Sequence, residues 1–257
     1  MVDFASEFPR VMFEVARLSM LWNTMVRLGD RGDGHPVMVL PGFTAGDEST
    51  LILRRFLTRL GYVSLPWLQG QNTGEAALLE GAMRRVYRAH LAYGEKISLV
   101  GQSLGGIYAR EIVREFPQAV RCVVTLGSPF AAEDAESTNP FVQRLFESMS
   151  GQTVDDMRER LHGVDPRAPL AMPATAVYSK SDGVAAWHTC LQRDSEISEN
   201  VEVVASHSGM AMNPDVLHVI ADRLSQDPAR WQRFGGHRGC GSWIYPKPVR
   251  VVETPQS

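Results

Sequence analysis

The sequence predicts an α/β fold in which a predominantly parallel sheet carries helices on both faces. From His35 onward, apolar runs rich in β-branched residues alternate with stretches of helical periodicity, a pattern typical of strand–helix–strand units. The runs are almost continuously apolar, as strands buried on both faces of a sheet are. With 257 residues, 44% of them hydrophobic, the chain can bury a full core, so we expect residues 1–257 to form a single domain.

Six strands and four helices are expected between His35 and Leu224. The apolar runs that predict strands are PVMVLPG near 36–42, YVSLPW at 62–67, KISLVG at 96–101, VRCVVTLG at 120–127, ATAVYS at 174–179 and VEVVA at 201–205. The helical patterns lie near 48–60, 74–92, 104–115 and 213–225.

Residues 1–30 are expected to contain an additional, amphipathic helix. Its apolar positions recur every three or four residues and are Phe4, Phe8, Val11, Val15, Leu18, Trp22 and Met25. The opposite face carries Glu7, Arg10, Glu14 and Arg17. We expect the apolar stripe to pack on the body of the protein, and contact with a membrane remains as the minor alternative.

Two segments lack the periodicity of the rest. The polar stretch from Phe130 to about Pro169 is long for a connection in a compact domain, and such insertions are often functional. The C-terminal segment 231–257, with GGHRGCGSW and several prolines, is expected to be irregular and loosely attached.

Composition excludes several classes of protein. A net charge of -3 leaves no basic excess for binding nucleic acid. Three cysteines, Cys122, Cys190 and Cys240, show neither a disulfide framework nor metal-binding spacing, which fits a reducing compartment. No secretion signal begins the sequence and no apolar stretch reaches the ~20 residues of a membrane span. We therefore expect a cytoplasmic protein.

Ser103 is the predicted nucleophile. It is the central residue of Gly101-Gln102-Ser103-Leu104-Gly105, which directly follows an apolar strand and directly precedes a helix. A serine at such a sharp turn projects its hydroxyl away from the backbone, and the flanking glycines relieve the crowding that the turn creates. The helix N-terminus also favours negative charge that develops there.

Two backbone N–H groups are predicted to form an oxyanion hole. The first strand ends in Leu40-Pro41-Gly42-Phe43-Thr44, at the edge of the sheet where Ser103 is also expected. Acyl transfer needs two donors aimed at the carbonyl oxygen as it becomes charged. We assign these donors to the N–H groups of Phe43 and Leu104.

A serine hydroxyl needs a base and a carboxylate that orients the base. Among seven histidines, His207 best fits the base, because it follows the last apolar run and precedes a helix. Asp182, in YSKSDGV, follows the preceding strand and is the first candidate for the acid. Asp134 and Glu133 are rival acids, since the loop after GSPF opens towards the same edge.

The motifs GQSLGG, PGF, YSKSDGV and SHSGM together resemble esterases and lipases of the α/β-hydrolase superfamily, including bacterial lipase-like members. The resemblance covers roughly residues 35 to 225. It implies catalysis through an acyl-enzyme, no cofactor, and a lid inserted after the sixth strand of the family, which corresponds here to 130–169. The predicted N-terminal helix stands where many members carry two antiparallel strands, so the resemblance also implies a sheet reduced at its N-terminal edge.

These observations predict a serine hydrolase that cleaves a carboxylic ester of a small molecule or a lipid. Acyl transfer to an alcohol or thiol, and thioester hydrolysis, remain open because the same three side chains serve them. A non-catalytic binding protein on the same fold is a further alternative, although the presence of all three residue types argues against it. No H-E-x-x-H pattern occurs, so a metal-dependent hydrolase is disfavoured and no metal site is predicted.

Overall fold

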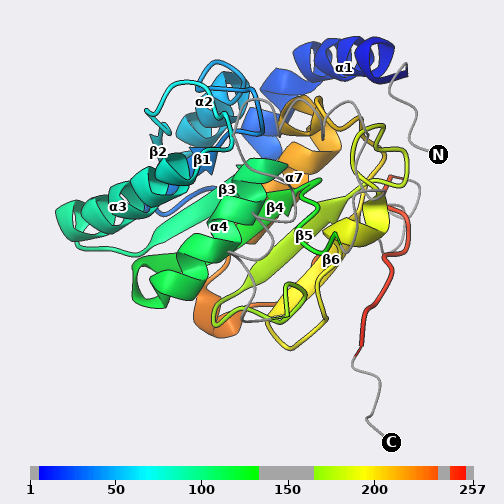
Figure 1. The fold of residues 1–257 in the computed structure, drawn as a ribbon. Helices are drawn as coiled ribbons and strands as arrows, with labels where there is room; N and C mark the ends of the chain where they lie inside the picture. The colour runs from blue at the N-terminus through cyan, green and yellow to red at the C-terminus, as the bar shows by residue number, and fades with distance from the viewer. Residues whose placement is uncertain (1–5, 133–164, 237–243, 253–257) are drawn as a thin grey trace, which may run out of the picture.

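The computed structural model describes residues 6–132, 165–236 and 244–252. Its centre is a six-stranded sheet in the order β2-β1-β3-β4-β5-β6, in which every neighbouring pair is parallel. The strands are β1 (Pro36–Leu40), β2 (Val63–Leu65), β3 (Ile97–Gln102), β4 (Val120–Leu126), β5 (Ala174–Tyr178) and β6 (Ser198–Glu202). The predicted parallel sheet is therefore confirmed (Figure 1).

Helices cover both faces of this sheet (Figure 1). The helices α1 (Glu7–Leu28), α2 (Leu51–Leu60) and α7 (Pro214–Ser225) contact one another on one face, and α3 (Ala76–Tyr93) contacts α4 (Leu104–Glu115) on the other. Short 3₁₀ helices span Pro117–Ala119, Trp187–Cys190, Met210–Met212 and Pro228–Arg230. Side chains alternate between the two faces along β1, as in any strand. Val37 and Val39 pack in the hydrophobic core shared with α1, α2 and α7, whereas Met38 and Leu40 pack in the core shared with α3 and α4.

The N-terminal helix is present, but its first half buries two carboxylates that the sequence analysis assigned to the solvent face. Glu7 and Glu14 are buried at 5% and 4% exposure, whereas Phe8 is 74% exposed. In the second half of α1 the expected orientation holds, because Leu18 is buried and Trp22 packs against the core. Within the described chain, no helix is both long enough and apolar enough to span a membrane.

The predicted lid segment 130–169 follows β4, and its residues 133–164 lie outside the described part of the chain. Its two described ends meet at Arg110 of α4. The Arg110 guanidinium lies 4.1 Å from the centre of the Phe130 ring and donates hydrogen bonds to the carbonyl oxygens of Pro166 and Ala168 at 2.9 and 3.0 Å. Arg110 thus joins the beginning and the end of the segment, while the lid itself stays a prediction.

In the C-terminal segment, the described residues 231–236 and 244–252 form no helix or strand, and they are firmly packed rather than loosely attached. Phe234 and Tyr245 are buried in the core beside α7. The backbone N–H of Val249 donates to the Tyr178 hydroxyl and that of Val251 donates to Asp194, both at 2.9 Å. The segment therefore covers the edge strand β6, which would otherwise be exposed.

Candidate active site

Ser103 lies in a strained turn between β3 and α4. Its φ of 51° and ψ of −121° are far from the regions that residues with a side chain normally occupy. Such a conformation costs on the order of 1–3 kcal/mol and persists only where surrounding contacts impose it. One such contact is the hydrogen bond from the Ser103 N–H to the carbonyl of Leu126 in β4, at 2.8 Å.

The glycines beside Ser103 are required by close backbone contacts. A Cβ atom at Gly101 would lie 2.3 Å from the carbonyl oxygen of Gly105, and a Cβ atom at Gly105 would lie 2.3 Å from that of Leu40. Both distances are far below a van der Waals contact. Only glycine lets the start of α4 approach β1 and β3 this closely, which explains why both positions of the motif are glycine.

Asp182 and His207 form a hydrogen-bonded pair. Asp182 follows β5 and His207 follows β6, and the imidazole Nδ1 lies 2.7 Å from the carboxylate Oδ2. The other oxygen, Oδ1, accepts the backbone N–H groups of Val184 and Ala185 at 2.8 Å each. The carboxylate is therefore fixed by its own loop, and its bond to Nδ1 leaves the other ring nitrogen, Nε2, to act as a base.

The surroundings of His207 favour its protonated form. Burial lowers the pKa of the imidazole, but the charge and hydrogen bond of Asp182 and the charge of Glu7 outweigh burial, so the pKa is raised above its ordinary value of 6.5. A base whose pKa lies close to working pH is well suited to accept a proton from a hydroxyl.

Gln102 connects the turn that carries Ser103 to the loop that carries His207. Its side-chain Nε2 donates to the backbone carbonyl of His207 at 2.9 Å. β3 and β4, whose carboxyl ends flank Ser103, are neighbours in the sheet, and β5 and β6 continue it. The structure thus brings Ser103, Asp182 and His207 to one edge of the sheet, the edge formed by the carboxyl ends of the strands.

The proposed oxyanion donors lie on two segments that meet beside Ser103. A Cβ atom at Gly42 would lie 3.4 Å from the Cβ of Ser103, so the turn containing Phe43 packs directly against Ser103. Leu104 is the first residue of α4, and N–H groups in the first helical turn have no acceptor within their own helix.

Asn72 holds the turn that contains Phe43, a role that the sequence analysis missed. Its side-chain amide donates to the Pro41 carbonyl at 3.0 Å, and its backbone carbonyl accepts the N–H of Thr44 at 2.8 Å. Thr44 itself adopts a φ of 61°. A polar residue 28 positions beyond Thr44 in a loop carries no local pattern that would have identified this contact. The rival acids Glu133 and Asp134 lie outside the described residues.

A second serine–histidine–aspartate chain occurs at the opposite edge of the sheet. The Nε2 of His35 lies 2.8 Å from the hydroxyl of Ser98, and its Nδ1 is hydrogen-bonded to Asp33. Ser98, the second residue of β3, is fully buried and lies roughly 16 Å along the chain from Ser103 at ~3.3 Å per strand residue. Because no substrate could reach its hydroxyl, this chain stabilises the sheet and serves as a natural control for Ser103.

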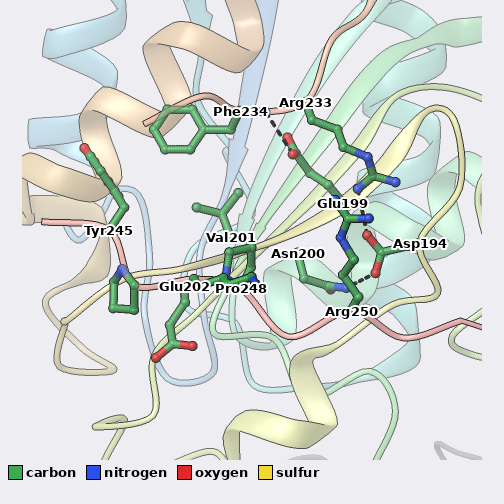
Figure 2. A pocket seen from close by; sticks show the side chains of 12 residues that line it. Asp194, Glu199, Asn200, Val201, Glu202, Arg233, Phe234, Tyr245, Pro248 and Arg250 are labelled. Carbon is green, nitrogen blue, oxygen red and sulfur yellow. Dashed lines mark hydrogen bonds and ion pairs between the residues drawn. The ribbon is translucent and has the colours of Figure 1, made fainter. Parts of the chain in front are cut away.

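One pocket of the molecule lies along β6 rather than at the carboxyl edge of the sheet (Figure 2). Its carboxylates are already paired, as Glu199 binds Arg223 and Asp194 binds Arg233, both at 2.7 Å, and Glu202 binds Lys180 at 2.9 Å. Neither Ser103 nor His207 lines it. Among the described residues, no group of three or more His, Cys, Asp or Glu side chains is arranged to hold a metal ion.

Comparison with known proteins identifies the fold. No protein-family model matches the sequence and no curated protein matches it. Lipase B of Aspergillus fumigatus superposes with a TM-score of 0.57 at 16% identity, over 77% of this chain and 55% of the lipase, so the chain spans little more than half of that enzyme.

Two further solved structures match over most of their own length. The monoacylglycerol lipase of Paleococcus ferrophilus has a TM-score of 0.53 at 14% identity, covering 77% of this chain and 96% of the lipase. The 2-hydroxy-6-oxo-6-phenylhexa-2,4-dienoate hydrolase of Rhodococcus sp. strain RHA1 has a TM-score of 0.54 at 16% identity, covering 74% and 90%. The chain therefore has the α/β-hydrolase fold, with lipases and esterases among its structural neighbours at low identity.

Proposed function

We propose that this chain is a serine hydrolase that cleaves carboxylic esters, with Ser103 as nucleophile, His207 as base and Asp182 as the carboxylate that orients it. The observation that carries the proposal is the 2.7 Å bond between Asp182 and His207 at the same sheet edge as a serine in a strained strand-to-helix turn. The lipases among the structural neighbours support an ester as the substrate class.

The reaction proceeds in two halves. His207 Nε2 takes the hydroxyl proton of Ser103 as Oγ attacks the ester carbonyl carbon, and then gives that proton to the departing alkoxide. The product of this half is an acyl-serine and a free alcohol. In the second half, His207 deprotonates water, the hydroxide attacks the acyl carbon, and the proton returns to Ser103 as the carboxylic acid leaves.

The N–H groups of Phe43 and Leu104 stabilise the oxyanion in both halves. Loss of one such donor typically costs about 3 kcal/mol of transition-state stabilisation, or roughly a hundredfold in rate. Asp182 stays ionised throughout and compensates the charge of the imidazolium that forms during each proton transfer.

The test compares Ser103→Ala with Ser98→Ala in hydrolysis of a p-nitrophenyl ester series and in labelling by a fluorophosphonate. Both variants remove one serine hydroxyl from β3 or from the turn that follows it, but only Ser103 is proposed to react. We expect Ser103→Ala to abolish turnover and labelling while Ser98→Ala retains both. A folded wild-type protein that neither hydrolyses any ester nor takes the probe would exclude the proposal and favour a non-catalytic binding protein.

The dependence of the hydrolysis rate on acyl-chain length distinguishes a lipase from an esterase that acts on small soluble esters. Preference for long chains presented as an emulsion would assign a lipid ester, and preference for short soluble chains would assign a small-molecule esterase. Faster acyl transfer to an added alcohol or thiol than to water would instead assign an acyltransferase that uses the same three residues.

A further inference from the structure

The helix α1 places charged side chains, rather than apolar ones, against the loops that carry Asp182 and His207. Glu7 and Glu14 are 5% and 4% exposed, while Phe8 and Phe13 between them are 74% and 64% exposed. Burial of a carboxylate is costly unless hydrogen bonds replace its hydration, so such an orientation requires specific partners for each charge. These partners include backbone N–H groups of the two loops.

Glu7 accepts three backbone N–H groups from these loops. Its Oε1 accepts from Gly183, the residue after Asp182, at 2.8 Å and from His207 itself at 3.1 Å. Its Oε2 accepts from Ser208 at 3.1 Å. A single oxygen atom therefore joins the loop of the acid to the loop of the base, although these loops follow different strands.

Arg10, one helical turn further along α1, binds carbonyl oxygens of the same two loops. Its guanidinium donates to the Ser181 carbonyl and to the Ala205 carbonyl, the latter at 2.6 Å, and lies 3.8 Å from Glu7. Glu14 accepts the N–H of Ser206 at 2.7 Å. Donors and acceptors of α1 thus alternate against loops that begin about 170 residues later in the chain.

We propose that Glu7 is a positioning residue of the hydrolase site, which fixes the separation and orientation of Asp182 and His207 by binding the backbone on both sides. The inference rests on the proposed function of this site. Glu7 touches neither Ser103 nor a reacting atom, so it acts through the imidazole and not on the substrate. Fixing two catalytic groups in relation to each other is worth a large factor in rate, because a displacement of about 1 Å can cost a hundredfold.

Because Glu7 is charged, its positioning role can be tested through the pKa of His207, which a purely packing role of Glu7 would not affect. The charged groups of the described chain that face His207 are Asp182 from the loop after β5 and Glu7 from α1, with Arg10 and Glu14 beside them on the same helix. Glu7 raises the pKa of His207 together with Asp182. Removing the charge of Glu7 should therefore lower the pKa of the imidazole even if the fold is unchanged.

The experiment compares Glu7→Gln, Glu7→Ala and the control Glu199→Gln. Glu199 is matched to Glu7 because it is also a buried carboxylate that accepts a backbone N–H, that of Phe234 at 2.9 Å, but it lies near the amino end of β6. Three quantities are measured for each protein: the free energy of unfolding in urea, kcat and KM for the preferred p-nitrophenyl ester, and the pKa of His207 from the pH dependence of its imidazole NMR signals.

We expect Glu7→Ala to lower kcat about 30-fold with KM within about twofold of wild type, since orientation and not binding is lost. Glu7→Gln keeps one acceptor oxygen, so its kcat should fall only about threefold while the pKa of His207 falls because the charge of Glu7 is lost. Glu199→Gln should lose stability without changing kcat or the pKa of His207.

Glu7 variants that lose stability but keep the wild-type kcat and the wild-type pKa of His207 would overturn the inference and leave Glu7 with a purely structural role. The NMR titration needs no turnover, so the inference and the proposed function can fail separately. A wild-type protein without esterase activity, in which Glu7→Gln still lowers the pKa of His207, would exclude the proposed function while supporting the contact between Glu7 and the histidine loop.

Discussion

Gln102 and His207, 105 positions apart, are joined by a hydrogen bond of 2.9 Å from the glutamine side chain to the histidine backbone carbonyl. Gln102 is the residue directly before Ser103, so this bond connects the strained turn to the loop that carries His207. Its second contact, to the carbonyl of Ser208 at 3.5 Å, reaches the next residue of the same loop. The side chain in the second position of the Gly-x-Ser-x-Gly motif therefore stabilises the position of the His207 loop.

Replacing Gln102 by methionine should impair catalysis more than stability. Methionine keeps the length of the side chain but removes the donor, so the His207 loop loses one restraint next to Ser103. We expect kcat/KM to fall about tenfold, while the free energy of unfolding falls by about 1 kcal/mol, the usual worth of one hydrogen bond. Ester hydrolysis and urea denaturation measure the two quantities.

Gln69→Met is the matched control for this variant, because the Gln69 side chain also donates to a backbone carbonyl, that of Leu78 at 3.1 Å, away from the histidine loop. It should lose similar stability and keep its activity. Equal losses of kcat/KM in Gln69→Met and Gln102→Met would show that the effect of the second is one of general stability.

The pH dependence of the reaction should report the pKa of His207. Protonated imidazole cannot accept the proton of Ser103, so kcat/KM should rise with pH and reach half of its maximum above pH 6.5, since the pKa is raised in the folded protein. Asp182→Asn removes the negative charge that contributes most to raising this pKa. It should shift the acid limb to lower pH and reduce kcat by about 10⁴-fold, as the loss of the orienting carboxylate does in other serine hydrolases.

An acid limb of Asp182→Asn that coincides with that of the wild type would argue that another carboxylate orients His207. Glu133 and Asp134, the two rivals expected from the sequence, would then be the residues to replace. The same pH profile therefore tests the choice among the three acids.

The sequence predicted the parallel sheet and the sheet edge at which Ser103, Asp182 and His207 lie, because both are encoded locally. A buried strand needs a continuous apolar run, and the turn at Ser103 needs glycine at positions 101 and 105, where a Cβ atom would strike backbone. Asp182 and His207 follow strands whose carboxyl ends share one edge of the sheet, so their order along the chain was sufficient to predict their meeting. The last strand was misplaced, because β6 spans Ser198–Glu202 and so begins and ends three residues earlier than the apolar run 201–205 that predicted it.

The orientation of α1 could not be predicted in the same way. Periodicity identifies an amphipathic helix and its two faces, but which face is buried depends on what lies beside it. Next to Glu7 and Glu14 lie the backbone N–H groups of His207 and Ser206, about 200 residues away, which donate hydrogen bonds to them. The attachment of the tail through Val249 and Val251 has the same origin, as it depends on side chains of the distant residues Tyr178 and Asp194.

On α1, replacing the buried Glu14 should lower the free energy of unfolding more than replacing the exposed Phe8. Hydrophobicity alone would predict the reverse order. Phe8→Ser replaces a side chain of 74% exposure and should change the free energy of unfolding by less than about 0.5 kcal/mol. Glu14→Leu removes the acceptor of the Ser206 N–H and of the Asn213 amide, and should cost about 2–4 kcal/mol because these buried donors are left without a partner. Urea denaturation of both variants measures these changes. A larger loss of unfolding free energy for Phe8→Ser would indicate that the helix buries the apolar face predicted from the sequence.

His35 should make the fold sensitive to mild acid. Burial lowers the pKa of the His35 imidazole below 6.5. Burial is also the largest single effect on Asp33 and raises its pKa, but the hydrogen bonds from His35 and the charges of His35 and Arg121 together outweigh it and lower the pKa of Asp33 to about 2. For His35, the unfolded chain therefore takes up a proton as the pH falls through 6.5 while the folded chain does not, so stability is lost on acidification below that value. For Asp33, the stability present above its ordinary pKa of 3.8 is lost only as the pH falls towards 2.

His35→Gln separates these two effects, because glutamine keeps a polar contact to Ser98 but cannot titrate. At pH 8 the variant should be less stable than wild type by about 1–2 kcal/mol, the cost of imperfect hydrogen bonds at a buried site. Between pH 7 and pH 5 its free energy of unfolding should fall less steeply than that of the wild type, and the difference between the two curves isolates His35 from the other histidines. Parallel curves over this range would mean that folding leaves the proton affinity of His35 unchanged, and the buried chain from Asp33 to Ser98 would then contribute no dependence on mild acid.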